Sequence, residues 1–375
     1  MSGPDTQTPV GASVFLSLSG LDDLIRSLKQ SGYEVVGPTL RQGAICYDRI
    51  HAVQDLPRGW TDRQEPGHYR LERREDDACF GYVVGPQSWK QFLFPPMSTV
   101  SLAELSTDGW RVTANDGANE PRFAFLGVRA CELAAIAIQD RVFQQAAYTD
   151  PIYAARRERA LLIAVNCTQA APTCFCESMH TGPRCSSGFD LALTELDDGF
   201  IVEVGSQRGA TLIATVATVG VTDEQLQWAE ERRSGARKQQ RQMPRETARD
   251  TVLGNLQHPR WSEVAERCLS CTNCTQVCPT CFCSSVHEVT DLDMTRVERE
   301  RVWDSCFNLE FSYMNGGAVR NSIRSRYRQW LTHKLGSWHE QFGTSGCVGC
   351  GRCITWCPVG IDLTEEVVAL AGGST

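Results

Sequence analysis

The pattern of apolar and polar positions predicts alternating helices and strands in the first part of the chain. Apolar residues recur at helical spacing over Leu21–Tyr33, and Glu34–Val36 begins a strand. Phe123–Val128 and Leu161–Val165 are short apolar runs, and the segment Glu132–Phe143 between them has the pattern of a helix. A strand, a helix and a second strand in this order predict a βαβ unit with parallel strands.

Two β-hairpins are predicted where strand-like segments flank polar turns. His68–Leu71 and Cys79–Val84 lie on either side of a turn that contains three consecutive acidic residues. Asp190–Leu196 and Phe200–Val204 lie on either side of an Asp-Asp-Gly turn, which favours the tight connection of a hairpin. The first part of the chain is therefore expected to be an α/β region with added hairpins.

The later part of the chain has a different pattern. The segment from about Asp223 to Asp250 is rich in charged residues, which is typical of a solvated helix followed by a linker. Helical patterns follow over Trp261–Arg267, Met294–Asn308 and Asn321–Lys334. A domain boundary is therefore predicted at the end of the charged segment.

Length and charge narrow the class of protein. A chain of 375 residues is long enough for about two domains. We expect an α+β fold, with an α/β domain over residues 1–250 and a mainly helical domain over residues 251–375. A net charge of −8 argues against a nucleic-acid-binding protein. Because no apolar run approaches the roughly 18 residues that span a bilayer, and Met1–Val10 lacks the features of a secretion signal, a cytoplasmic protein is predicted.

Eighteen cysteines indicate metal binding or redox chemistry. Disulfides do not persist in a reducing compartment, so a cytosolic chain rich in cysteine usually binds metal or carries out redox reactions. Eleven of the cysteines lie between Cys268 and Cys357, and five lie between Cys131 and Cys185. The metal sites are therefore expected mainly in the C-terminal third.

Two cysteine runs in that third have the spacing of bacterial ferredoxins. Residues 268–279 and 347–358 both read C-x2-C-x2-C-x3-C-P, the signature in which the fourth cysteine binds the cluster of the other run. Two [4Fe–4S] clusters are therefore predicted. The first is expected on Cys268, Cys271, Cys274 and Cys357, and the second on Cys278, Cys347, Cys350 and Cys353. A pair of zinc sites is the alternative, although zinc sites rarely use three cysteines at two-residue gaps before Cys-Pro.

A third cluster is predicted in the α/β domain. The sequence Pro-Thr-Cys-Phe-Cys occurs twice, at residues 172–176 and 279–283, and the first copy follows the βαβ unit. Cys131 lies just after the first strand of that unit, at the start of the helix, and Cys167 lies just after the second strand. Open α/β sheets bind ligands at the carboxyl ends of their strands, where these two thiols would be neighbours. The expected ligands of a [4Fe–4S] or a zinc site are Cys131, Cys167, Cys174 and Cys176, with Cys185 as a substitute.

The remaining thiols have a simpler interpretation. Free cysteine is often buried as a small apolar residue, and this is the alternative for the third site as well. Cys46 and Cys79, on predicted strands, are expected in the core. Packing beside the clusters is expected for Cys281, Cys283 and Cys306. A basic stretch over residues 320–334 either compensates cluster charge, docks an acidic partner, or forms a solvated helix face.

The motifs together support a family resemblance that extends over nearly the whole chain. They include Gly127–Glu132, Asn166-Cys167, Cys174–Cys176, Trp303–Cys306 and Cys347–Cys353. With these motifs the chain resembles the iron–sulfur β subunits of cytosolic sulfhydrogenase-type [NiFe] hydrogenases, and also the iron–sulfur electron-transfer subunits of anaerobic sulfite reductases. One departure is Ala-Cys-Glu within the first motif, where Pro-Cys-Asp is expected.

The resemblance implies an electron-transfer subunit that is not catalytic alone. Such a subunit relays electrons through its clusters between a flavin- and NAD(P)-binding subunit and a [NiFe] hydrogenase or, alternatively, a sulfite reductase. The sequence agrees, because it lacks a G-x-G-x-x-G fingerprint after a strand, a P-loop and a Cys-x-x-Cys-His haem motif. The rival interpretation is an enzyme whose N-terminal domain binds flavin or a sulfur substrate such as polysulfide.

Overall fold

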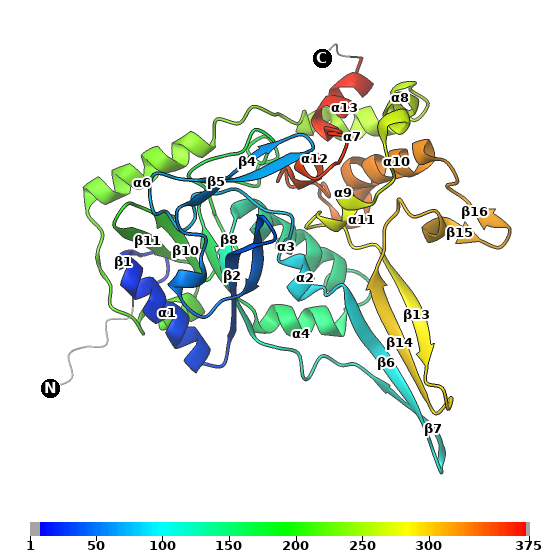
Figure 1. The fold of residues 1–375 in the computed structure, drawn as a ribbon, viewed down its shortest axis with the longest axis horizontal. Coiled ribbons are helices and arrows are strands. Elements are labelled where there is room, and N and C mark those ends of the chain that lie inside the picture. Colours follow the sequence, from blue (N-terminus) through cyan, green and yellow to red (C-terminus); the bar gives the residue numbers. More distant parts are fainter. Residues whose placement is uncertain (1–7, 373–375) are drawn as a thin grey trace.

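The computed structural model describes residues 8–372, and its largest element is an eight-stranded mixed sheet (Figure 1). The strand order is β12-β1-β11-β10-β9-β8-β2-β3. The strands are β1 (Ser13–Ser17), β2 (Glu34–Arg41), β3 (Ala44–Arg49), β8 (Phe123–Val128), β9 (Leu161–Val165), β10 (Leu191–Glu195), β11 (Gly199–Val204) and β12 (Val219–Gly220). Neighbours along the series β2, β8, β9 and β10 are parallel, and the outer pairs are antiparallel.

Helices cover both faces of this sheet. Side chains alternate between the faces along each strand, so Leu126 of β8 joins one core and Phe125 joins the other. The first core also holds α1 (Leu18–Gln30) and α5 (Gln207–Ile213). The second holds α2 (Lys90–Leu93), α3 (Ala130–Phe143) and α4 (Pro151–Arg159). The predicted first helix is thus confirmed, with a start and an end about three residues earlier than expected.

The predicted βαβ unit and the second hairpin are confirmed. β8 and β9 pair in parallel, and α3 begins two residues after β8 ends. The buried carboxylate of Glu132 accepts a hydrogen bond from the backbone N–H of Arg129, which closes the first turn of α3. β10 and β11 form the antiparallel pair that was expected around the Asp-Asp-Gly turn.

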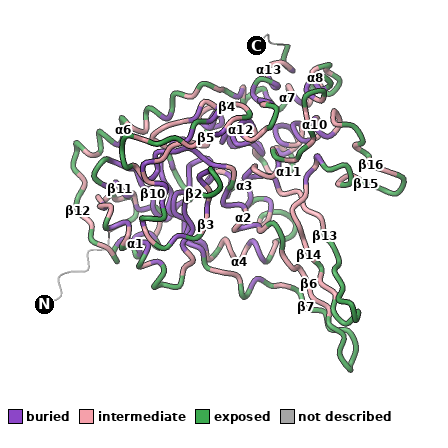
Figure 2. The backbone as a smooth tube through the Cα atoms, viewed as in Figure 1, coloured by how far each residue is buried: buried purple, intermediate pink, exposed green. Residues whose placement is uncertain are grey.

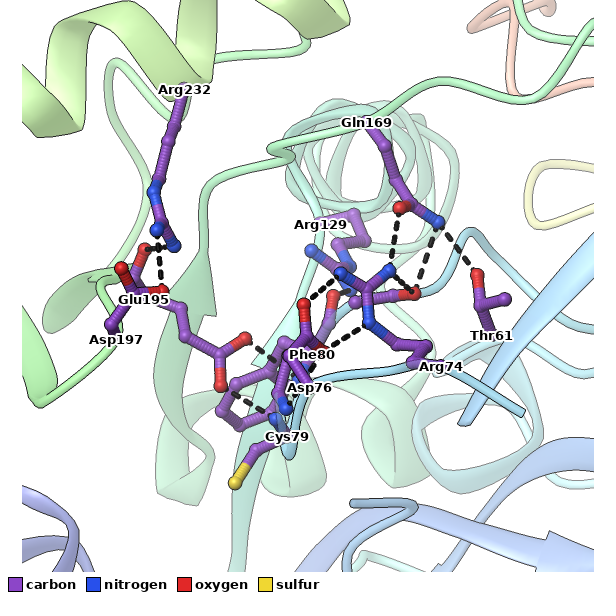
Figure 3. A network of polar contacts seen from close by, with 12 residues as sticks. Thr61, Arg74, Asp76, Cys79, Phe80, Arg129, Gln169, Glu195, Asp197 and Arg232 are labelled. Carbon is purple, nitrogen blue, oxygen red and sulfur yellow. Dashed lines mark hydrogen bonds and ion pairs between the residues drawn. The ribbon is translucent and has the colours of Figure 1, made fainter. Parts of the chain in front are cut away.

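The first predicted hairpin is wrong in one strand. β5 (His68–Arg73) exists, but it pairs with β4 (Trp60–Glu65), and Cys79–Val84 is not a strand. The backbone N–H groups of Cys79 and Phe80 donate instead to the buried carboxylate of Glu195, as Figure 3 shows. The carbonyl of Phe80 accepts from Arg129. Because these side chains satisfy the backbone, the segment needs no strand partner.

A second sheet forms an arm that projects from the body of the molecule (Figure 1). Its order is β13-β14-β6-β7, and its strands are β6 (Met97–Ser106), β7 (Gly109–Ala114), β13 (Ser284–Thr290) and β14 (Arg296–Trp303). The far end of the arm is exposed (Figure 2). The helix predicted over Met294–Asn308 is wrong, because this segment pairs as β14 with β6 from much earlier in the chain. Helical spacing alone did not reveal that partner.

The C-terminal part is mainly helical and has its own core. Helices from both sides of the cysteine runs pack around Trp261, Tyr327 and Leu331. The helices are α7 (Arg245–Gly254), α8 (Arg260–Arg267), α9 (Asn273–Gln276), α10 (Ile323–Thr332), α11 (Trp338–Phe342), α12 (Arg352–Thr355) and α13 (Leu363–Leu370). A π-helical turn, His333–Ser337, joins α10 to α11, and a small exposed hairpin consists of β15 (Tyr313–Met314) and β16 (Gly317–Ala318). The helices predicted around Trp261–Arg267 and Asn321–Lys334 are confirmed.

The α+β fold class is confirmed, and the division at residue 250 stays a prediction. The charged segment does form a largely exposed helix, α6 (Asp223–Ala236). α7 then crosses the predicted boundary, and its Ala248 and Val252 belong to the C-terminal core. None of the helices within residues 8–372 has both the length and the apolar character that a membrane crossing needs.

Candidate iron–sulfur sites

The first ferredoxin-type set of thiols gathers at the surface end of the C-terminal core. Cys268 follows α8 and Cys274 lies in α9, while Cys357 arrives from the second run just after α12. The four predicted ligands line one hollow together with Phe307, Tyr327 and Trp330. The pKa of Cys274 is raised by burial and then by the neighbouring thiols of this set. Cys271 is exposed, so this set reaches the protein surface.

The second set is more deeply enclosed. Cys278 leaves the first run and lines a hollow with Cys347, Cys350 and Cys353. Burial raises the pKa of Cys347 to about 12, and the charge of Lys334 opposes this rise. Cys353 lines the hollow of the first set as well. The exchange of the fourth cysteine that the spacing predicts is therefore geometrically available in this fold.

The third predicted set lies at the carboxyl ends of β8 and β9. Cys131 is in the first turn of α3, and Cys167 follows β9. Burial, followed by the charges of Cys176, Cys167 and Cys350, raises the pKa of Cys174. Burial, followed by the charges of Cys176 and Cys350, also raises the pKa of Cys131. The structure thus brings the four thiols into one buried neighbourhood beside the second set.

Cys185, the substitute ligand, lies on the far side of Cys167. Its pKa is raised above the ordinary value by burial and then by Cys167. The backbone N–H of Cys185 donates to the side chain of Asn166 over 2.8 Å, which fixes its position. It packs with Phe189 in the core below α3. Cys185 therefore has a structural role in addition to its proximity to the site.

Close backbone contacts join the second and third sets. The N–H of Phe175 donates to the carbonyl of Gly349 over 2.9 Å. Gly349 has a φ of +66°, and a Cβ there would lie 2.6 Å from the carbonyl oxygen of Phe175. Gly351 has a φ of +77°, and a Cβ there would lie 2.5 Å from the carbonyl oxygen of Thr173. Only glycine permits this approach, because both positions combine left-handed backbone with a backbone neighbour.

A buried ion pair stands between these two sets. Arg352 and Glu132 are both fully buried and bonded to each other. The second carboxylate oxygen of Glu132 accepts hydrogen bonds from Tyr47 and Trp89, while Arg352 also donates to two backbone carbonyls. Burial opposes the charge of Arg352, but Glu132, Cys350 and Cys131 outweigh it and raise the pKa of the guanidinium. Arg352 therefore supplies positive charge to thiolates on both sides.

Two buried lysines face the second set from the other side. The ammonium of Lys334 lies 3.2 Å from the sulfur of Cys278 and 3.1 Å from the carbonyl of Gly346. The ammonium of Lys90 donates to the carbonyl of Cys281 over 3.2 Å and lies 3.9 Å from the ring centre of Trp303. Within the described residues no carboxylate forms an ion pair with either lysine. Of the three interpretations of the basic stretch, compensation of cluster charge is the one that Lys334 fits.

The chemistry of these donors fits iron–sulfur clusters. Cluster ligation requires thiolates, which burial alone disfavours, so adjacent buried cations are the expected compensation. Among residues 8–372, no three cysteine, histidine or acidic side chains approach closely enough to hold a single metal ion. The thiols of the first and second sets line two hollows. Such a hollow fits a cluster better than a single zinc ion, which is held by four ligands directly around it.

Comparison with known proteins identifies the family. The model of a 4Fe-4S dicluster domain matches residues 267–361, which include both ferredoxin-type runs. The chain is 34% identical over 348 residues to sulfhydrogenase 2 subunit beta of Pyrococcus furiosus, covering 91% of this chain and 92% of that protein. The chain belongs to the sulfhydrogenase β-subunit family. No solved structure matches it.

Family membership establishes an iron–sulfur protein with an electron-transfer role. It agrees with the resemblance found from the motifs, because the similarity extends beyond the cluster domain to the α/β region. The individual ligand assignments and the cytoplasmic location stay predictions. Sequence reasoning did not single out Lys90, Arg352 and Glu132 as functional residues. Arg352 and Glu132 lie in the family motifs, but a motif does not reveal that a charged side chain is buried.

Proposed function

We propose that this chain relays single electrons between a flavin- and NAD(P)-binding subunit and a [NiFe] hydrogenase in a hetero-oligomer. The observation that supports this most directly is the adjacency of three thiol sets. Cys353 borders the hollows of both the first and the second set. Cys350 of the second set acts electrostatically on Cys131, Cys174 and Cys176 of the third. Three clusters held in this order would form a continuous path.

The protein's own contribution is to hold the thiolates and their charge. A [4Fe–4S] cluster, when bound, supplies one-electron redox chemistry. The ammonium of Lys334 donates a hydrogen bond to the sulfur of Cys278. The charge of the Arg352 guanidinium favours the thiolate forms of both Cys350 and Cys131. These buried cations stabilise the added negative charge of a reduced site. Three aromatic residues, Phe307, Tyr327 and Trp330, form an apolar part of the wall around the first set.

The two ends of the path are the proposed contact points for partner subunits. At the first set, exposed Cys271 lies beside the exposed apolar residues Leu269 and Val359. At the third set, a cavity of 640 Å³ opens next to the segment that carries Cys176, and Arg184, Arg233 and Arg237 line it. Glu177 and Glu230 line the same cavity and form ion pairs with Arg237 and Arg233, so this end is lined by charges of both signs. An apolar end and a charged end would suit different partners.

Iron content tests the number of clusters. After subtraction of the iron held by its partner subunits, the anaerobically purified complex should contain about twelve irons and twelve labile sulfides per copy of this chain, since each cluster holds four irons. Cys131→Ala or Cys167→Ala should lower the iron content to about eight, and Cys46→Ala should leave it unchanged. A wild-type content of about eight irons would overturn the third cluster and keep the other two.

Partner identity is tested on the same preparation. Mass spectrometry of the copurified subunits, with hydrogen-dependent reduction of NAD(P), is expected to identify a [NiFe] hydrogenase pair and a flavoprotein. A copurified sirohaem subunit and sulfite-dependent oxidation of NAD(P)H would instead assign the chain to a sulfite reductase. Stoichiometric flavin bound to this chain alone would contradict the role of a pure relay.

A further inference from the structure

Three of the thiols that the relay does not use lie close together. Cys281 and Cys283 belong to the second copy of Pro-Thr-Cys-Phe-Cys, and Cys306 follows β14. All three line a cavity of 530 Å³ that also receives Arg320, His333 and Lys334. Cys283 and Cys306 are half-buried, so they are reachable through this cavity. Cys281 is buried and donates a hydrogen bond to Cys278, as expected of a thiol that packs beside a cluster.

Cys283 and Cys306 are held together by the base of the arm. Cys283 directly precedes β13, and its carbonyl accepts the N–H of Asp304 over 2.8 Å. The side chain and the backbone N–H of Cys306 both donate to the sulfur of Cys283. The turn between Asp304 and Cys306 is fixed, because the hydroxyl of Ser305 bonds to Thr275 and to the N–H of Phe307. The two thiols therefore meet in direct contact.

The contact divides the two thiols into different protonation states. The hydrogen bond from Cys306 is the main cause that lowers the pKa of Cys283 to about 7, and Lys334 and Lys90 act in the same direction. The same bond raises the pKa of Cys306 above its ordinary value. Near neutral pH, Cys283 is thus partly a thiolate, whereas Cys306 is a thiol. A thiolate beside a protonated partner is the arrangement that thiol–disulfide chemistry uses.

The pair also lies between the two ferredoxin-type sets. Cys274 of the first set acts electrostatically on Cys306. Lys334 lines the cavity of the pair and bonds to Cys278 of the second set. The first set therefore acts on the pair electrostatically, and Lys334 links the pair to the second set.

We propose that Cys283 and Cys306 form a redox-active dithiol that exchanges two electrons with the neighbouring [4Fe–4S] clusters. On oxidation a sulfur–sulfur bond forms between the two residues, Cys306 loses one proton, and two electrons pass singly to two oxidised clusters. In the reverse direction two reduced clusters each return one electron, the sulfur–sulfur bond breaks, and Cys306 takes up the proton. The pair would convert between one-electron and two-electron transfer at the centre of the relay. The proposal rests on the proposed function, because the clusters are its redox partners.

The test uses the intact complex poised at defined potentials with redox mediators. Each sample is quenched in acid, denatured, alkylated with N-ethylmaleimide and digested, and the peptides that contain Cys283 and Cys306 are quantified by mass spectrometry. At low potential both residues should carry the label. At higher potential a Cys283–Cys306 cross-linked peptide should replace them, with a two-electron dependence on potential, about 30 mV per tenfold change. Equal labelling of both thiols at every potential that leaves the clusters intact would overturn the proposal.

Variants separate this site from the clusters. Cys306→Ser should abolish the cross-link and lower the electron uptake of the complex by about two per chain, with the iron content unchanged. Cys46→Ser is the matched control and should alter neither quantity. Loss of iron in Cys306→Ser would assign the thiol to a cluster and overturn the dithiol. If wild-type iron content instead shows fewer clusters than proposed, the cross-link measurement still decides the dithiol on its own.

Discussion

The two copies of Pro-Thr-Cys-Phe-Cys have the same five residues and the same support but different thiol neighbours. Both threonines are fully buried. Thr173 bonds to Thr355 over 2.9 Å, and Thr280 donates to the carbonyl of Gly346 over 2.6 Å. Each copy is thus anchored on the segment that carries the second ferredoxin-type run. The motif specifies how the loop docks.

The surroundings decide what the thiols do. Cys174 and Cys176 of the first copy are neighbours of Cys131 and Cys167, which lie at the ends of two strands. In the second copy, Cys283 has Cys306 as its thiol neighbour in direct contact, next to buried lysines. A local motif therefore supplies two thiols, and their tertiary partners distinguish the proposed cluster site from the proposed dithiol.

The largest effect is expected from Arg352→Met, which removes the charge between the second and third sets. Glu132 would stay buried without its partner, and breaking a buried ion pair this way costs about 3–5 kcal/mol. The midpoint of anaerobic guanidinium unfolding should fall accordingly. The double variant Arg352→Met with Glu132→Leu should recover part of the loss. An unchanged midpoint in the single variant would contradict the proposed role of the pair.

Gly349→Ala should disturb the first copy alone. Its backbone φ of +66° and the carbonyl of Phe175 at 2.6 Å leave no place for a Cβ, so the contact between the second run and Phe175 must open. We expect a loss of about 1–3 kcal/mol and of the irons of the third site. Gly346→Ala is the matched variant, since its Cβ would meet Trp338 beside the second copy. Equal iron loss in both variants would remove the distinction between the copies.

Lys334→Met should shift a potential without removing a cluster. Loss of the ammonium 3.2 Å from Cys278 disfavours the more negative, reduced state, so the potential of the second cluster should fall. A hydrogen bond to a charged group contributes about 1.5–3 kcal/mol. For a one-electron couple this energy corresponds to a change in reduction potential of roughly 60–130 mV. Redox titration followed by electron paramagnetic resonance measures the change. The signal of the third cluster should not move, and a shift in both would contradict a local effect.

The smallest effect concerns the pH dependence of Cys283. Its pKa of about 7 predicts that alkylation by iodoacetamide in the reduced complex accelerates as pH rises through 7, because the thiolate reacts. In Cys306→Ala the midpoint should move upward, since the hydrogen bond from Cys306 is the main cause of the lowering. Peptide mapping of the labelled complex follows the rate. A midpoint that is the same in the variant would contradict the pairing.

Features that are encoded within one short segment could be predicted from the sequence. The spacing of the two cysteine runs carries the ligand prediction, because the geometry of one cluster is encoded over a few consecutive residues. Short apolar runs predicted β8 and β9 correctly, and the position of Cys131 and Cys167 after them follows from strand direction. The Asp-Asp-Gly turn likewise predicted β10 and β11, since the hairpin is local.

Features that depend on residues far apart in the chain could be recognised only from the tertiary structure. Cys79–Val84 is not a strand because Glu195, more than a hundred residues away, accepts hydrogen bonds from the backbone N–H groups of Cys79 and Phe80. Arg296–Trp303 is a strand because β6 provides the pairing edge. The burial of Lys90 and Arg352 beside thiols is equally invisible to local pattern, because desolvation depends on every element packed around a side chain. The same reason explains why two identical motifs have different thiol neighbours.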